Sequence, residues 1–164
     1  MRDLDESLLR AMRTRGHSPA VEGAARALGK TGNNGGIWLA LGVVLALADP
    51  AHREAWLICA VLGPVAIGLN FAVKLVVKRP RPVLEGLPPL GGAPSSLSFP
   101  SAHATSSFAV ATAMTRVDSL GALAFLLALA LSLGRPYLGM HYPSDVLAGA
   151  LLGVALGLIV PLSL

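Results

Sequence analysis

Long apolar segments constrain this chain more than any other feature. Five of them follow the first 34 residues, over 35–48, 55–73, 103–115, 120–133 and 146–164. Each is apolar all round and rich in Leu and Ala, and none shows the alternation of a half-buried strand, so each predicts a helix. A helix needs about 20 residues to cross a bilayer, so the three shorter segments must extend into their polar flanks or thin the bilayer. The predicted fold is all-α: a polytopic membrane helix bundle of five transmembrane helices.

The composition agrees with a membrane protein and excludes several other classes. Hydrophobic residues make up 54% of the 164 residues and charged residues 13%, whereas a soluble domain has about 25% charged residues. Disorder is excluded because there is ample apolar surface to bury. A disulfide scaffold is excluded because Cys59 is the only cysteine.

The excess positive charge, +4 at pH 7, is placed as in a membrane protein. Six of the thirteen Lys and Arg residues lie in the first thirty positions and four lie between Lys74 and Arg81, with no basic run interleaved with aromatic residues. Nucleic acid is therefore not an expected partner. Residues 1–34 form a basic N-terminal segment without the apolar stretch of a cleavable signal peptide. Its apolar residues recur at helical spacing and predict an amphipathic helix, either in the membrane interface or packed on the protein: Leu4, Leu8, Leu9 and Met12.

The odd number of predicted spans gives the expected topology of the transmembrane domain, residues 35–164. With five spans, the N-terminal segment and the connectors 74–101 and 134–144 share one side of the membrane. That side carries eleven basic residues and the other carries only Arg53 and Arg116. The positive-inside rule therefore places the two connectors in the cytoplasm of a plasma-membrane protein.

Gly149, Gly153 and Gly157 recur at every fourth position of the last apolar segment. Such a stripe of small residues lets two helices approach closely. We expect it to pack within one chain; a seam between two copies is the alternative.

Three polar blocks on the predicted cytoplasmic side carry the candidate chemistry: residues 74–82, 99–103 and 134–145. Lys74, Arg81 and Arg135 could converge on one dense negative charge, since Arg donors suit phosphate oxygens. Ser101 and Ala102 would open a helix, where free backbone N–H groups favour an anion. The sequence thus predicts an anion site.

Two histidines suggest two chemical roles at that site. Asp145 follows His141 by four residues and could take the Nδ1 proton, leaving Nε2 as a nucleophile. His103, at the predicted start of the third apolar helix, would act as the general acid. We expect neither a metal nor another cofactor, since Asp145 is the only carboxylate in these blocks. The individual residues could instead be interfacial anchors or a structural ion network, but their joint occurrence favours catalysis.

At these residues the chain resembles the type 2 phosphatidic acid phosphatases, a superfamily that also contains vanadium-dependent haloperoxidases. Lys74 precedes Arg81-Pro82 with six residues between, Pro100-Ser101-Ala102-His103 matches the second motif of the family, and Arg135, His141 and Asp145 have the spacing of the third. The resemblance implies a phosphohistidine on His141, acid–base work by His103, and phosphate binding by five residues: Lys74, Arg81, Ser101, Ala102 and Arg135. Ala102 stands where the family has Gly, and Gly134 where it has Ser. Lys78 and Arg79 match no fixed position and could bind substrate or lipid headgroups.

The resemblance also suggests a lipid-phosphate substrate, with membrane lipids as the surroundings. The short chain and the stretch Thr31-Gly-Asn-Asn-Gly-Gly are similar to actinobacterial members that dephosphorylate decaprenylphosphoryl-5-phosphoribose, a precursor of cell-wall arabinan, in the cytoplasm. Phosphatidic acid, phosphatidylglycerophosphate or a polyprenyl diphosphate is the alternative substrate. A non-enzymatic subunit that binds anionic lipid is the opposing class, and a haloperoxidase is disfavoured because those relatives are large and soluble.

Overall fold

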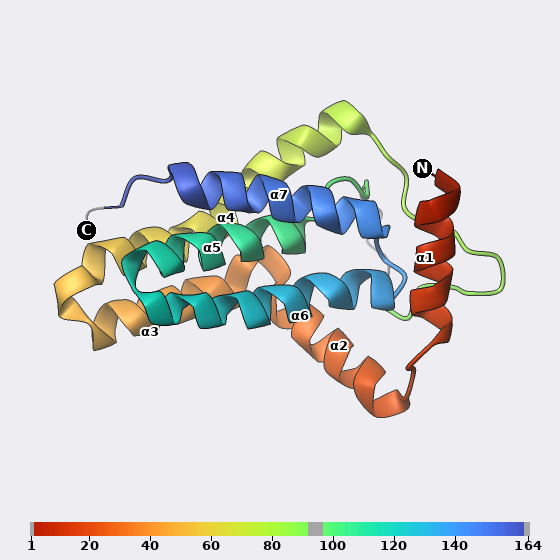
Figure 1. Ribbon diagram of the computed structural model, residues 1–164, viewed down its shortest axis with the longest axis horizontal. Helices are drawn as coiled ribbons and strands as arrows, with labels where there is room; N and C mark the ends of the chain where they lie inside the picture. Colours follow the sequence, from red (N-terminus) through yellow and green to blue (C-terminus); the bar gives the residue numbers. More distant parts are fainter. Residues whose placement is uncertain (1, 92–96, 163–164) are drawn as a thin grey trace.

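The computed structural model describes residues 2–91 and 97–162, and over these ranges every regular element is a helix, which confirms the all-α prediction (Figure 1). Short 3-10 turns, η1 (Asn33–Gly35), η2 (Pro50–His52) and η3 (Ser119–Leu123), join some of the helices. The α-helices, in chain order, are α1 (Arg2–Thr14), α2 (Pro19–Thr31), α3 (Gly36–Ala48), α4 (Arg53–Val77), α5 (Ala102–Val117), α6 (Ala124–Tyr137) and α7 (Pro143–Ile159).

The five apolar segments correspond to α3 through α7, but several ends differ from the prediction. Helix α4 continues to Val77, so Lys74 lies in its last turn and not in the following connector. Helix α6 continues to Tyr137 despite Pro136, so Arg135 is also helical. Pro136 has no N–H to donate to the carbonyl of Ser132, so this last turn lacks one backbone hydrogen bond. Helix α7 ends at Ile159, ahead of Pro161; the predicted end of that segment, 163–164, lies outside the described residues.

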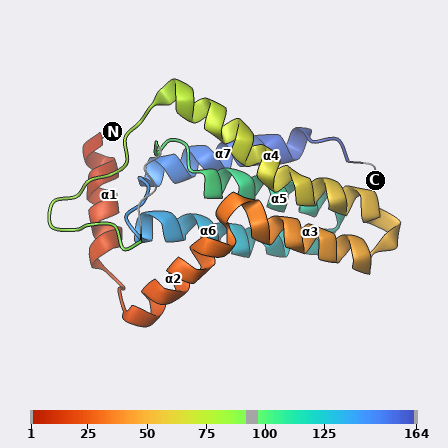
Figure 2. The same ribbon diagram turned by 180° about the vertical axis from the view of Figure 1, so that it is seen from behind.

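Helix α5 forms the centre of the bundle, packed against α4, α6 and α7 (Figures 1 and 2). Small residues make this close packing possible, since most of the buried positions of α5 are Ala, Ser or Thr. The glycine stripe of α7 faces α5: a Cβ on Gly149 would lie 2.6 Å from the carbonyl oxygen of Ser101, and one on Gly157 would lie 2.5 Å from that of Ala109. The stripe therefore packs within the chain, as expected.

Helix α3 packs against α4, and α4 in turn packs against α5. Gly42 of α3 allows contact with α4, because a Cβ there would lie 2.6 Å from the Cβ of Ala60. The buried Trp38 crosses from α3 to α5, and its indole Nε1 donates a hydrogen bond to Oγ of Ser107 at 3.0 Å. A buried indole N–H needs such a partner.

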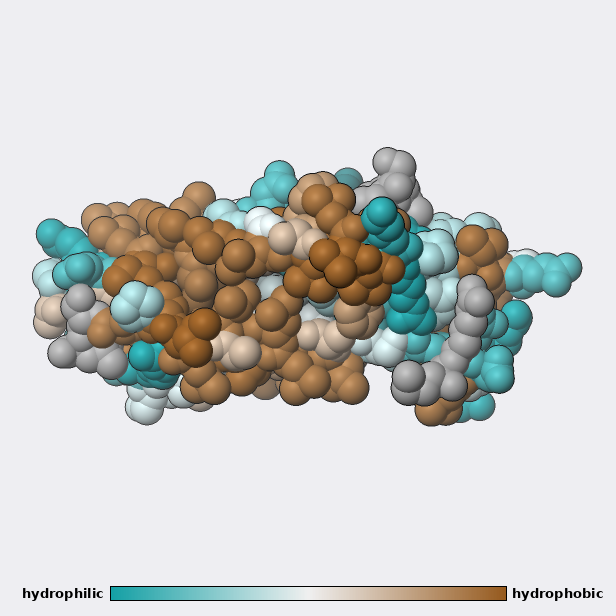
Figure 3. Space-filling model, turned by 90° about the horizontal axis from the view of Figure 1, so that it is seen from above, coloured by the Kyte–Doolittle hydropathy of each residue, from teal (hydrophilic) through white to brown (hydrophobic). Residues whose placement is uncertain are grey.

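Apolar side chains cover the outside of the bundle, as bilayer contact requires. Figure 3 shows a hydrophobic band over the middle of the molecule, with hydrophilic residues gathered toward its ends. Within the described residues, two helices are long and apolar enough to cross a membrane, Pro50–Val77 and Ser119–Tyr137. The bent pair Pro19–Thr31 and Asn33–Ala48 could form a third span, and Pro143–Ile159 is a shorter apolar helix. The five predicted spans thus remain a prediction.

The N-terminal segment forms two helices where one was expected. Helix α1 has the predicted amphipathic character and crosses one end of the bundle (Figure 1). Leu9 is fully buried against the protein while Leu4 and Leu8 are exposed, so one face of α1 packs on the bundle. Helix α2 was not predicted. Its signal was the N-cap Ser18 followed by Pro19 at the first helical position.

Candidate active site

The structure brings the three polar blocks together at the end of the bundle that α1 crosses (Figure 1). The first block reaches the third, since Nη1 of Arg81 donates to the carbonyl oxygen of the residue before His141 at 2.6 Å. The second block meets the third through the backbone N–H of Ser101, which donates to the carbonyl oxygen of Asp145 at 2.9 Å. The ammonium of Lys74 joins the first block to the second, at 2.8 Å from the carbonyl oxygen that precedes Ser101.

His141 is buried, 3% exposed, in the turn between α6 and α7. Its Nε2 lies 3.2 Å from Nη1 of Arg81. Because a guanidinium only donates, Nε2 is the acceptor, and the ring proton is assigned to Nδ1. Burial lowers the pKa of His141 from 6.5 to about 4; the adjacent Asp145 acts in the opposite direction, and the positive charge of Arg81 adds to the lowering. The imidazole is thus neutral at pH 7, the state required of a nucleophile.

Asp145 lies beside His141 and is itself held by the start of α7. As the third residue of that helix, its Oδ2 accepts the backbone N–H of Tyr142 at 2.9 Å, and the two residues form a capping box. The same oxygen lies 3.5 Å from Nδ1 of His141, slightly beyond an ordinary hydrogen bond. The predicted His141–Asp145 pair is therefore present, at ion-pair distance.

Three buried polar atoms around this pair have no hydrogen-bond partner among the described residues: Oγ of Ser101, Nε of Arg135 and Nδ1 of His141. Ser101 occupies the N-cap position of α5, which begins at Ala102 as predicted, but its side chain makes no capping hydrogen bond; Arg135 lies in the last turn of α6. Unsatisfied buried polar groups are costly and rare. All three atoms are donors, given the proton assigned to Nδ1 of His141, and a phosphate oxygen is a partner that Ser101 and Arg135 could share.

Lys74 is occupied by the protein and does not present a free charge. Its Nζ donates to the carbonyl oxygens of Leu97, Ser98 and Pro100 at 2.9, 3.2 and 2.8 Å. These three bonds use all the donors of an ammonium. In this structure Lys74 fixes the segment that leads into Ser101, and direct phosphate binding by Lys74 stays a prediction.

His103 lies in the first turn of α5 and faces α2. Its Nε2 is 2.9 Å from the carbonyl oxygen of Gly29, so the ring donates its Nε2 proton to the last turn of α2. A Cβ on Gly29 would lie 2.9 Å from Nη1 of Arg135, and one on Gly32 would lie 2.9 Å from Cδ2 of His103. Two glycines thus let the end of α2 cover the site, a feature that the sequence analysis missed.

The sequence analysis also missed the role of Arg79. The sequence left it as a candidate contact for substrate or lipid headgroups, yet its Nη1 donates to Oδ1 of Asp145 at 2.8 Å and to Oγ of Ser144 at 2.7 Å. Its Nη2 donates to Asp5 of α1 at 2.7 Å, and the guanidinium lies 4.0 Å from the ring centroid of Tyr142. Arg79 is therefore part of the support of Asp145, and the headgroup interpretation does not fit this structure.

The chain is similar in sequence and in fold to known phosphatases. The chain is 40% identical over 131 residues to decaprenylphosphoryl-5-phosphoribose phosphatase of Mycolicibacterium smegmatis, covering 80% of this chain and 72% of the relative. It is 28% identical over 123 residues to undecaprenyl-diphosphatase BcrC of Bacillus subtilis, covering 74% of this chain and 60% of that relative. Among solved structures, LpxE of Aquifex aeolicus is similar with a TM-score of 0.79 and 27% identity, over 95% of this chain and 93% of that chain.

The family model of the PAP2 superfamily matches residues 54–164. This range contains all three polar blocks and both site histidines, and it leaves out α1, α2 and α3. The match covers more than half of the chain, and the 40% identical relative covers more than two thirds of it. The protein, a membrane protein by its apolar helices, belongs to the PAP2 superfamily.

Proposed function

We propose that the protein is an integral membrane lipid phosphatase that hydrolyses a phosphomonoester through a phosphohistidine on His141. The observation that carries the proposal is the position of His141: a neutral, buried imidazole whose Nε2 faces Arg81 beside the unpartnered donors of Ser101 and Arg135. A phosphoryl group held by those donors would have its phosphorus in front of that nitrogen. Positioning and charge stabilisation supply most of the catalysis of phosphoryl transfer.

The first step transfers the phosphoryl group to His141. The Nε2 lone pair attacks phosphorus, the bond from phosphorus to the ester oxygen breaks, and that oxygen takes a proton from the imidazolium form of His103, which becomes neutral. Asp145 stabilises the positive charge that develops on the imidazole of His141. In the structure the Nε2 proton of His103 is directed to the carbonyl oxygen of Gly29, so the leaving oxygen would take the place of that carbonyl as the acceptor.

The second step releases phosphate. A water molecule attacks phosphorus while His103 takes one of its protons, and the phosphorus–nitrogen bond breaks. Inorganic phosphate leaves, the electron pair returns to Nε2 of His141, and both histidines are restored. The sum is hydrolysis of one phosphomonoester by one water, and no step draws on a metal or another cofactor.

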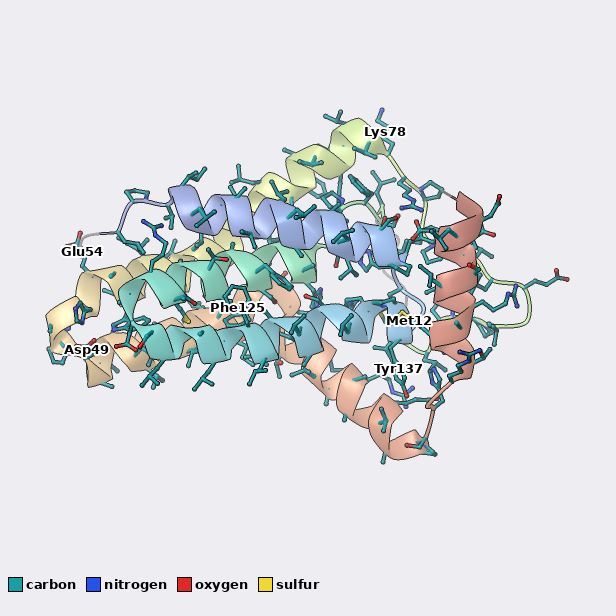
Figure 4. All side chains as sticks on the ribbon, viewed as in Figure 1. Met12, Asp49, Glu54, Lys78, Phe125 and Tyr137 are labelled. Carbon is teal, nitrogen blue, oxygen red and sulfur yellow. The ribbon has the colours of Figure 1, made fainter. Side chains whose placement is uncertain are left out.

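Decaprenylphosphoryl-5-phosphoribose is the proposed substrate. Its support is the 40% identity to a phosphatase of that name and the charge distribution, which predicts a cytoplasmic site. The site end carries α1, α2 and the connectors with eleven basic residues, while the opposite end carries two; Figure 4 labels the acidic Asp49 and Glu54 at that opposite end. With five spans the positive-inside rule puts the site end in the cytoplasm. A polyprenyl diphosphate is the second candidate, favoured by the similarity to the undecaprenyl-diphosphatase.

A panel assay tests both the activity and the substrate. The purified full chain in detergent is given polyprenyl-phosphoribose phosphate, polyprenyl diphosphate or phosphatidic acid, with chelator present, and phosphate release is measured. We expect release, fastest from the first substrate, and loss of all release in His141→Ala. His52→Ala is the matched control, since His52 is exposed at the far end of the bundle. Equal turnover in His141→Ala and His52→Ala would refute the mechanism, and binding without turnover by the wild type would favour the lipid-binding subunit.

A further inference from the structure

Helix α1 reaches the catalytic carboxylate through a single arginine. We infer that Asp5 and Arg79 are positioning residues that hold Asp145 beside His141, so that the N-terminal helix is a working part of the active site. The inference rests on the proposed function, and it adds two residues that lie outside the three motifs.

The contacts form a continuous chain from α1 to the nucleophile. Asp5 accepts from Nη2 of Arg79 at 2.7 Å, and Nη1 of Arg79 donates to Oδ1 of Asp145 at 2.8 Å. The other oxygen of Asp145 lies 3.5 Å from Nδ1 of His141. Each carboxylate oxygen of Asp145 thus has a separate function, one toward Arg79 and one toward His141 and the α7 backbone.

Asp5 also fixes the first turn of α7 directly. One carboxylate oxygen accepts the backbone N–H of Ser144 at 3.0 Å, and the other accepts the hydroxyl of Ser144. A carboxylate at a helix N-terminus satisfies a free N–H and interacts favourably with the helix dipole. Because Asp145 follows Ser144, the position of the catalytic carboxylate depends on a side chain 140 residues away in the sequence.

Burial makes these contacts mutually dependent. The side chain of Asp145 is 0% exposed, that of Asp5 is 9% exposed and that of Arg79 is 23% exposed. A buried carboxylate without a partner carries a large desolvation cost, and removing one partner of a buried pair leaves the other charge uncompensated. The planar fork of Arg79 serves two carboxylates at once, which the single ammonium of a lysine cannot do with the same geometry.

Arg79 is committed to this support and is not a substrate contact. Both of its terminal nitrogens donate to side chains of the protein, and the plane of the guanidinium lies over Tyr142. Its influence on the reaction must therefore pass through Asp145. The effect belongs to the chemical step, since substrate binding uses other side chains.

Removing Arg79 should also change the titration of His141. Four groups act on that ring: Asp145 from α7, Arg81 from the connector after α4, Arg135 from α6 and His103 from α5. Without the positive charge of Arg79, Asp145 becomes a stronger acceptor and favours the imidazolium. The pKa of His141 then rises, and the acid limb of the pH–rate profile moves to higher pH.

The test is a double-mutant cycle on the full chain, using whichever panel substrate the wild type hydrolyses. The variants are Arg79→Met, Arg79→Lys, Asp5→Asn and the double variant Asp5→Asn/Arg79→Met. Arg10→Met and Asp3→Asn are matched controls, since both residues are exposed on α1, the helix that carries Asp5. Thermal melting in detergent confirms that each variant is folded.

We expect Arg79→Met to lower kcat by about 10- to 100-fold with little change in KM, as loss of supporting contacts does at other sites. The acid limb should move to higher pH, and Arg79→Lys should recover part of the rate. Asp5→Asn should lower kcat by a smaller factor. The double variant should be slower than Arg79→Met by less than the factor that Asp5→Asn alone costs, because Asp5 acts partly through Arg79 and partly through its direct contacts with Ser144.

Three results would overturn the inference while leaving the phosphatase intact. They are an unchanged kcat in Arg79→Met, a raised KM at constant kcat, or rate losses of Asp5→Asn and Arg79→Met that multiply in the double variant. A wild type inactive on every substrate would instead overturn the proposed function, and the inference with it.

Discussion

Nη1 of Arg81 lies 3.2 Å from Nε2 of His141. An arginine that faces the lone pair of a buried imidazole opposes protonation of that ring, and it can also hold an anion in front of it. The contact therefore adds to the effect of burial in keeping the proposed nucleophile neutral, and it marks the place where a phosphate oxygen would bind.

The pKa of His141, about 4 in the folded protein against 6.5 ordinarily, predicts the pH dependence of stability. Between these values the unfolded chain binds a proton that the folded protein does not, so folding stability falls as the pH falls from 6.5 to 4. We expect His141→Gln to lose part of this slope. Thermal melting across pH 4–7 measures it, with His52→Gln as the control; equal slopes in the two variants would contradict the lowered pKa of His141.

Alanine at Gly29 or Gly32 should reduce turnover. The added Cβ would lie 2.9 Å from Nη1 of Arg135 or from Cδ2 of His103, and must displace α2 or the site side chain. Gly23→Ala is the matched control on the same helix, because a Cβ there meets nothing within 4 Å. A steady-state assay should show lower kcat for the first two variants and wild-type values for the third. Equal activity of all three would show that α2 does not cover the working site.

Gly153→Ala should destabilise the bundle. Its Cβ would press on the carbonyl oxygen of Thr105 and on the backbone nitrogen of Ala109, neither of which is a flexible side-chain end. Overpacking of this kind costs about 1–3 kcal/mol. Gly68→Ala in α4, where a Cβ meets nothing within 4 Å, should melt like the wild type. If Gly153→Ala also melts like the wild type, the account of α5–α7 packing is contradicted.

The orientation of the chain can be measured with single cysteines. Cys59 is buried and is replaced first. Glu85→Cys and His52→Cys then place exposed thiols at the site end and at the opposite end. We expect an impermeant thiol reagent to label position 52 in intact cells and position 85 only in inside-out vesicles. The reverse pattern would place the site on the outer face.

The hydropathy of the chain was sufficient to predict the five core helices and the class of the fold. The ends of α4 and α6 were set too early, because Lys74 and Arg135 were treated as breaks in apolar segments, whereas a long side chain can extend from a last turn into a polar site. Helix α2 was missed because its composition is mixed, and only Ser18-Pro19 indicated its start.

The candidate site was predictable to the extent that it depends on motif spacing. His141, Asp145 and Arg81 lie together as expected. The role of Arg79 could not be predicted, because its partner Asp5 lies 74 positions away and a single acidic residue on an amphipathic helix has no distinctive pattern. The role of Gly29 could not be predicted either, because this glycine acts only by having no side chain where Arg135 lies close to α2.

The central claim is that His141 carries the phosphoryl group. Protein given substrate labelled in its terminal phosphate, then quenched within milliseconds and held at alkaline pH, should retain a label that is lost on mild acid treatment. We expect this acid-labile label, mapped to the peptide that contains His141, in the wild type and in His52→Ala, and none in His141→Ala. An active enzyme with no label, or a label that persists in His141→Ala, would contradict the account.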